Sequence, residues 1–154
     1  MPVSSWNKRR EVSHLSKILE LHQYAEEHRI DVDYFSLGVV ESLSMPVYGS
    51  NAIAIDPDKI QSEADETYKL AHELGHCGYG GFYNAKSPLD LRGKREYKAD
   101  VWAVQKVLPF DELREAIQSG IHERWELAEH FNLPEEFINF ALTYYLERKG
   151  YTID

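Results

Sequence analysis

The residues His72-Glu73-Leu74-Gly75-His76 place two imidazoles and a carboxylate at a spacing that suits metal-assisted hydrolysis. On an α-helix, residues four apart lie on one face, so His72 and His76 can bind the same cation. Glu73 would lie beside that cation, where it can accept a proton from an attacking water molecule. Zinc binds neutral imidazole readily, and a catalytic zinc site uses three protein ligands and leaves one position open. The motif therefore predicts a zinc hydrolase that needs one more ligand.

The third ligand is expected on the next helix. The metzincin pattern would place glycine at 79 and histidine at 82, but the chain has Tyr79 and Phe82, which excludes that class. Glu96 and Asp100 follow, one helical turn apart on one face. We expect Glu96 to complete a His₂Glu site and Asp100 to accept the remaining N–H of a ligand histidine. The alternative for both is an exposed pair that forms salt bridges with nearby arginines and lysines.

Several side chains near the motif could donate a hydrogen bond to a tetrahedral oxyanion. The tyrosine candidates are Tyr79, Tyr83 and Tyr97. The sequence does not choose among them, because the chain has 10 tyrosines. His122 and His130 could play the same part, but nothing in the sequence brings them to the metal. Cys77 follows a ligand directly but points about 100° away around the helix axis, so we expect a small buried residue.

The composition limits the partners and the location of the protein. The net charge of −9 argues against direct binding to nucleic acid, because such binding draws its affinity from Lys and Arg, and it favours a basic protein as partner. No segment approaches the roughly 20 apolar residues of a membrane span. No apolar stretch follows the basic residues near the N-terminus, and one cysteine cannot form an internal disulfide. We therefore expect a cytoplasmic protein without a membrane segment.

The hydrophobic pattern predicts an α+β fold in one domain, residues 1–154. Short β-prone runs between residues 30 and 57, with a turn at Gly49-Ser50-Asn51, predict an antiparallel sheet of about three strands. Ser62 is the expected cap of the helix that carries the motif, Gly78, Gly80 and Gly81 are expected to end it, and a loop is expected over residues 79–93. The helices are expected over residues 11–28, 62–78, 94–107, 111–118, 122–131 and 134–149. The domain would consist of an N-terminal helix and sheet, the zinc-site helices and C-terminal helices, over residues 1–61, 62–110 and 111–154.

The segments Thr67–His76, Glu96–Ala103 and Leu108-Pro109 resemble the ImmA/IrrE metallopeptidase family. The stretches Gly81–Asn84 and Ser87–Asp90 resemble members carried by phages and integrative elements of Gram-positive bacteria. The resemblance is strong over residues 62–110, weaker over the N-terminal helix and sheet, and general over the last helices. It implies a gluzincin-like zinc endopeptidase.

The resemblance also assigns roles and a substrate. His72, His76 and Glu96 would bind zinc, and Glu73 would be the general base. Many relatives have a second glutamate where this chain has Lys98, which strengthens Glu96 as the ligand. Relatives relieve repression by cleaving a helix-turn-helix repressor encoded beside them. Some carry a fused DNA-binding domain, but only one helix is expected before the sheet here, so the repressor would be a separate chain.

Two other functions remain open at this stage. A zinc-stabilised binding module could disable the repressor by sequestration, without hydrolysis, and would need the ligands but not Glu73. A toxin or a maturation protease would share the chemistry and differ in substrate. In the peptidase reading, a strand within residues 45–55 would hold an extended substrate by backbone pairing.

Overall fold

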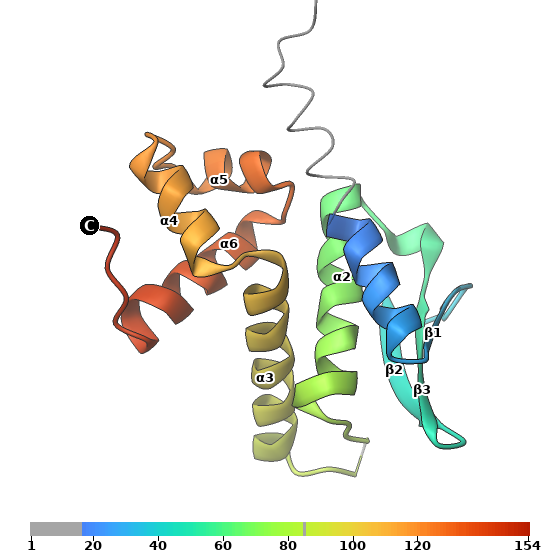
Figure 1. The fold of residues 1–154 in the computed structure, drawn as a ribbon. Helices are drawn as coiled ribbons and strands as arrows, with labels where there is room; N and C mark the ends of the chain where they lie inside the picture. The colour runs from blue at the N-terminus through green and yellow to red at the C-terminus, as the bar shows by residue number, and fades with distance from the viewer. Residues whose placement is uncertain (1–16, 85) are drawn as a thin grey trace, which may run out of the picture.

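The computed structural model describes residues 17–84 and 86–154, and it has the α+β architecture predicted from the sequence (Figure 1). A helical segment covers residues 17–27; residues 11–16 of the predicted first helix lie outside the described residues. The longer helices are α2 (Glu63–Gly75), α3 (Leu89–Val107), α4 (Phe110–Gln118), α5 (Arg124–Phe131) and α6 (Glu135–Leu142). A 3-10 turn, η1 (Pro57–Lys59), precedes α2, and π-helical turns continue α2 and α6 as η2 (His76–Gly80) and η3 (Thr143–Arg148).

The sheet has the three strands expected, but its pairing is mixed. Strands β1 (Ile30–Tyr34), β2 (Ser42–Val47) and β3 (Ser50–Ile55) lie in the order β1-β3-β2. Strand β2 is antiparallel to β3, as expected, whereas β1 is parallel to β3, which corrects the prediction of a wholly antiparallel sheet. The reason is burial: β3 ends in three buried residues and takes the centre, while Pro46 lacks an N–H and suits an edge strand.

The turn between β2 and β3 lies one residue earlier than predicted. Tyr48 and Gly49 connect Val47 to its register partner Ser50. Both turn residues have a positive φ, +44° and +83°, as a type I′ hairpin turn requires.

The two helices expected to hold the metal site are present, with one changed boundary. Helix α2 begins as predicted, because the Ser62 hydroxyl accepts a hydrogen bond of 3.1 Å from the Asp65 backbone N–H. Helix α3 begins at Leu89, five residues before the predicted start at Lys94. Gly93 made this stretch look like a loop, but a glycine costs a helix only about 1 kcal/mol, which the packing of a 19-residue helix offsets.

Gly75, inside the motif, allows α2 and α3 to lie unusually close together. A Cβ at this position would be 2.5 Å from the carbonyl oxygen of Ala99 and 2.9 Å from its Cα. Ala99 is itself fully buried. Two small residues thus set the separation of the helices, which lie side by side in Figure 1.

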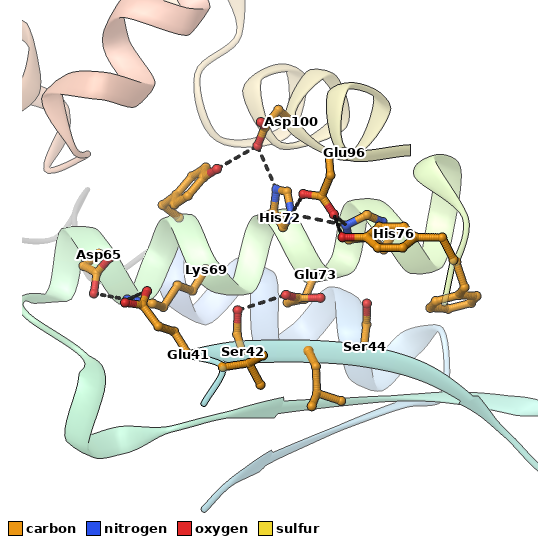
Figure 2. Close-up of a pocket in the computed structure, with 15 residues that line it drawn as sticks. Glu41, Ser42, Ser44, Asp65, Lys69, His72, Glu73, His76, Glu96 and Asp100 are labelled. Carbon is orange, nitrogen blue, oxygen red and sulfur yellow. Dashed lines mark hydrogen bonds and ion pairs between the residues drawn. The ribbon is translucent and has the colours of Figure 1, made fainter. Parts of the chain in front are cut away.

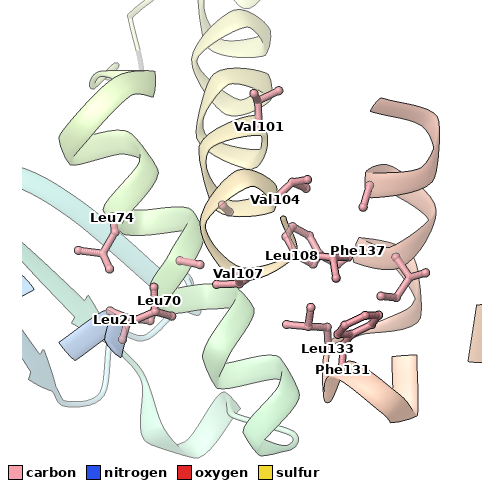
Figure 3. Packing of buried hydrophobic residues seen from close by; sticks show 14 of the residues in the cluster. Leu21, Leu70, Leu74, Val101, Val104, Val107, Leu108, Phe131, Leu133 and Phe137 are labelled. Atoms are coloured by element: carbon pink, nitrogen blue, oxygen red, sulfur yellow. The ribbon is translucent and has the colours of Figure 1, made fainter. Parts of the chain in front are cut away.

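The remaining elements cover these two helices from both sides. The sheet and residues 17–27 lie beside α2, and α4 to α6 lie on the side of α3 away from the sheet (Figure 1). Figure 3 shows Leu21 next to Leu70 on one side, and Val104 and Leu108 near Phe137 on the other. None of the helices in the described part combines the length and apolar character needed to cross a bilayer.

Candidate metal centre

The side chains of His72, His76 and Glu96 converge on one point between α2 and α3. The Glu96 carboxylate lies 2.9 Å from Nε2 of His72 and 3.0 Å from Nε2 of His76, and the two Nε2 atoms are 3.2 Å apart. In a tetrahedral site with metal–ligand distances of about 2.1 Å, two donor atoms lie about 3.4 Å apart. The three groups therefore form a set that could hold one metal ion.

Each imidazole is oriented by a partner on its other nitrogen. Nδ1 of His72 lies 2.7 Å from Oδ1 of Asp100, and Nδ1 of His76 lies 2.8 Å from the carbonyl oxygen of Gly81. Both partners are acceptors, so each ring donates its Nδ1 proton to its partner and turns Nε2 towards the shared point. Asp100 thus contacts His72, and its expected part in supporting a metal ligand stays a prediction.

Gly81 was read from the sequence only as part of a helix end, and its contact with His76 was missed. The π-helical turn η2 follows α2, and Gly81 then adopts a φ of +72°. Its N–H donates to the carbonyl of His76 at 2.9 Å, while its own carbonyl accepts from the ring. A Cβ at this position would also lie 2.2 Å from a guanidinium nitrogen of Arg95. The positive φ favours glycine at this position, whereas the flexible end of the Arg95 side chain can move aside.

Tyr68 is a second group that sequence reasoning missed. Its hydroxyl donates to Oδ1 of Asp100 at 2.8 Å, the same oxygen that accepts from His72. Burial, followed by the Asp100 carboxylate, raises the pKa of Tyr68 and keeps it a donor. The available signal was spacing, because Tyr68 lies one helical turn before His72.

The electrostatics of the cluster couple the ligands tightly. Burial by itself would lower the pKa of His72, but hydrogen bonds to Asp100 and Glu96 outweigh it and raise the pKa to about 10. The pKa of His76 is also raised against the effect of burial, chiefly by Glu96 and the Gly81 carbonyl. Hydrogen bonds from His72 and His76 hold the pKa of Glu96 well below its usual range. A metal ion bound here would take the place of protons on the imidazoles.

Glu73 lies in the same cavity but does not belong to the ligand cluster. Its side chain is buried, with 6% exposed, and one carboxylate oxygen accepts a hydrogen bond of 2.9 Å from the Ser42 hydroxyl on β2. Figure 2 shows Ser42 and Ser44 rising from the strand towards Glu73. Sequence reasoning did not identify Ser42, because strand order decides which residues face α2.

A cavity of about 490 Å³ opens between β2 and the two helices. The ligands and Glu73 form its inner part, and Lys69, paired with Asp65 and with Glu41 at 3.2 Å, also lines it (Figure 2). The remaining lining residues are Val40, Ser42, Leu43, Ser44, Tyr68, Phe82, Tyr83 and Asp100. The cavity thus has a helical wall and a strand wall.

Of the three tyrosines considered as oxyanion donors, the structure brings Tyr83 to the site. Its hydroxyl donates to Oε1 of Glu96 at 2.7 Å, and this bond, with burial, raises the pKa of Tyr83 to about 12. Tyr79 is 56% exposed and lies under the Lys98 ammonium. Tyr97 packs against Phe140, away from the cavity.

The other candidates do not line the cavity. His122 is exposed, and His130 packs against the neighbouring Phe131 ring. Cys77 is half-buried against the core, and burial raises the pKa of its thiol to about 12, so it remains protonated and unreactive at neutral pH.

Comparison with protein families matches residues 25–143 to the Peptidase_M78 family, described as the IrrE N-terminal-like domain. Searches of curated proteins and of solved structures returned no match. The matched region contains all three potential metal ligands, Glu73 and the strand wall. It covers more than half of the 154 residues and agrees with the resemblance to ImmA/IrrE peptidases. The chain therefore belongs to the Peptidase_M78 family, and a metallopeptidase-type function is the one that this family supports.

Proposed function

We propose that this chain is a zinc-dependent endopeptidase that cleaves a separately encoded, basic helix-turn-helix repressor and so acts as an anti-repressor. The observation that carries the catalytic part is the convergence of three ligand side chains beside a buried glutamate in one open cavity. A purely structural zinc site would use four protein ligands and would have no need for that glutamate.

The donor set favours zinc among divalent metals. Two imidazoles and one carboxylate, His72, His76 and Glu96, match the ligands of thermolysin-type peptidases. Zinc held by these residues would supply a Lewis acid and would lower the pKa of the attacking water towards 7. Asp100 and Gly81 hold the two rings in the tautomer that this binding requires.

The residues around the cluster supply the proton transfers and hold the substrate. Glu73 accepts the proton of the attacking water and delivers it to the leaving amine. Tyr83, whose hydroxyl already lies at the Glu96 carboxylate, donates a hydrogen bond to the developing oxyanion. Strand β2 is an edge of the sheet and lines the cavity, so an extended peptide can pair with its free side. This strand begins at Ser42, three residues before the range expected from the sequence.

The choice of a repressor as substrate rests on charge and on the family resemblance. Carboxylates predominate in the cavity lining, where Lys69 is the one lysine or arginine among the described residues. The whole chain carries a net charge of −9. Both features attract a basic segment, and repressors that bind DNA are basic on one face. A cytoplasmic location would place the enzyme with such a substrate.

The decisive experiment uses Glu73→Gln, which keeps the shape and hydrogen bonding of the side chain but cannot accept a proton at neutral pH. The purified proteins would be incubated with zinc and the repressor encoded beside this chain, and the products analysed by mass spectrometry. We expect the parent to cleave the repressor, and Glu73→Gln to bind zinc and repressor without cleavage.

Two outcomes would contradict the proposal. If Glu73→Gln relieved repression in cells as well as the parent does, the protein would act by sequestration. If the parent cleaved Lys- and Arg-rich test peptides but left the repressor intact, the peptidase chemistry would stand and the substrate would be another protein.

A further inference from the structure

Ser42 links the strand wall of the cavity to the general base on the helical wall. Its hydroxyl donates to Oε1 of Glu73 at 2.9 Å. Among the described residues it is the one hydrogen-bond donor to this carboxylate, which is only 6% exposed. A buried carboxylate without a hydrogen bond is costly, so the contact contributes to holding the charged side chain in place.

We infer that Ser42 is a positioning residue that fixes the Glu73 carboxylate for proton transfer, an inference that rests on the proposed peptidase function. With Oε1 held by the serine, Oε2 is left to accept the proton of water. Without this bond the carboxylate could rotate about its side-chain torsions, away from the geometry that proton transfer needs.

The serine hydroxyl is itself held in place by the sheet. Ser42 is the first residue of β2 and pairs in register with Ile55 of β3, which is fully buried. The strand that would bind the substrate therefore also carries the hydroxyl that contacts the base. A substrate peptide paired along β2 and the Glu73 carboxylate would therefore both be positioned by contacts with this strand.

Ser44 provides a matched control within the same strand. It lies two residues further along, on the same face, and also lines the cavity (Figure 2). No hydrogen bond joins its side chain to Glu73 among the described residues, where the bond comes from Ser42. Replacing either serine by alanine removes the same atoms from the cavity wall, but only one replacement frees the base.

The test compares Ser42→Ala, Ser42→Thr and Ser44→Ala in the zinc-loaded protein, with the repressor and with a Lys- and Arg-rich fluorogenic peptide as substrates. We expect kcat of Ser42→Ala to fall about tenfold, the effect of one hydrogen bond to a charged group, with KM and zinc affinity unchanged. Ser42→Thr keeps the hydroxyl and should retain most of kcat, and Ser44→Ala, which leaves the bond from Ser42 to Glu73 in place, should lose less kcat than Ser42→Ala.

A double-mutant cycle tests that Ser42 acts through Glu73. In the Glu73→Gln background the proton acceptor is already lost, so adding Ser42→Ala should reduce any residual activity no further. A second, full loss in that background would assign Ser42 a separate role and overturn the inference.

A crystal structure of Ser42→Ala gives a readout that does not depend on cleavage. We expect the Glu73 carboxylate to leave the position it occupies in the parent. If it stays in place, or if Ser44→Ala loses as much kcat as Ser42→Ala, the inference is wrong. If the parent cleaves neither substrate, the proposed function fails instead, and the position of Glu73 in this crystal structure still decides the part played by Ser42.

Discussion

The helical wall of the cavity, formed by α2 and α3, and its strand wall, formed by β2, hold their functional groups in different ways. On the helical wall each ligand imidazole has a second partner, Asp100 or Gly81, and the Glu96 carboxylate contacts both imidazoles. On the strand wall, among the described residues, one serine hydroxyl donates a hydrogen bond to Glu73, the proposed general base. The three potential metal ligands are thus held by several contacts, whereas among the described residues one hydrogen bond across the cavity reaches the proposed base.

Because of this difference, we expect that metal binding and the turnover of substrate can be changed separately. A change in the helical wall should weaken metal binding and cleavage together, because the ligands and their partners act as one cluster. A change at Ser42 should leave the metal bound and lower turnover alone. Variants of the helical wall and variants of Ser42 together test this separation.

The largest effect is expected when a ligand of the helical wall is removed. In Glu96→Ala, zinc affinity should fall more than about 100-fold, because losing even an outer partner costs about 10–100-fold. Competition with a fluorescent chelator measures this. Asp90→Ala, an exposed carboxylate in the first turn of the same helix, is the control and should bind zinc like the parent. Unchanged affinity in Glu96→Ala would assign the third ligand to another residue.

The next largest effect is expected when Asp100, the hydrogen-bond acceptor of the His72 ring, is replaced. In Asp100→Ala the His72 ring loses its acceptor, and zinc affinity should fall about 10–100-fold. The same chelator assay applies. Tyr68→Phe removes a donor to Asp100 but leaves the carboxylate on the ring, so its loss should be smaller. If Asp100→Ala bound zinc as tightly as the parent does, Asp100 would form only a surface ion pair and would not support the metal site.

Gly75→Ala tests the close approach that brings the two sides of the metal cluster together. The added methyl group meets the Ala99 backbone, so α2 and α3 must separate, at a cost of about 1–3 kcal/mol in the free energy of unfolding. Urea denaturation of the metal-free protein measures this. Gly93→Ala is the matched control, because nothing lies within 4 Å of its Cβ and a helical alanine should add about 0.5–1 kcal/mol. Equal stabilities for the two variants would show that the contact at Gly75 is not restrictive.

The helical wall could be predicted from the sequence because its information is local. A spacing of four residues places His72 and His76 on one face of their helix, and the same spacing places Glu96 and Asp100 on one face of the next helix. The strand wall could not be predicted, since Ser42 faces Glu73 only because β3 inserts between β1 and β2. Short apolar runs identify strands but not their order, which depends on contacts distant in sequence.

The boundaries missed at the site have a similar cause. Gly81 looked like an ordinary helix end, and its role follows from a π-helical turn and a positive φ that bring its carbonyl back to His76. Gly93 looked like part of a loop, yet α3 runs through it. In both cases the glycine was recognised, but the packing around it decides which backbone conformation it adopts.

The last prediction concerns how zinc affinity depends on pH, where a change of one pH unit has a smaller effect than the loss of a ligand. In the metal-free protein the pKa of His72 is raised to about 10, so its imidazole is protonated at neutral pH. Zinc needs the neutral ring, so binding releases a proton, and affinity should rise about tenfold per pH unit between pH 7 and 9 for each proton released. The raised pKa of His72 also contributes stability to the metal-free fold, and this contribution is complete below about pH 6.5 and is lost as the pH rises through 10. Chelator competition and melting curves across this range measure the two trends, which should be opposite in sign.

In Asp100→Asn the acceptor that raises the pKa of His72 is weakened, so the rise in zinc affinity should level off at a lower pH. A zinc affinity independent of pH would mean that the imidazoles are already neutral, and that the ion pairs with Glu96 and Asp100 do not hold a proton in the cluster.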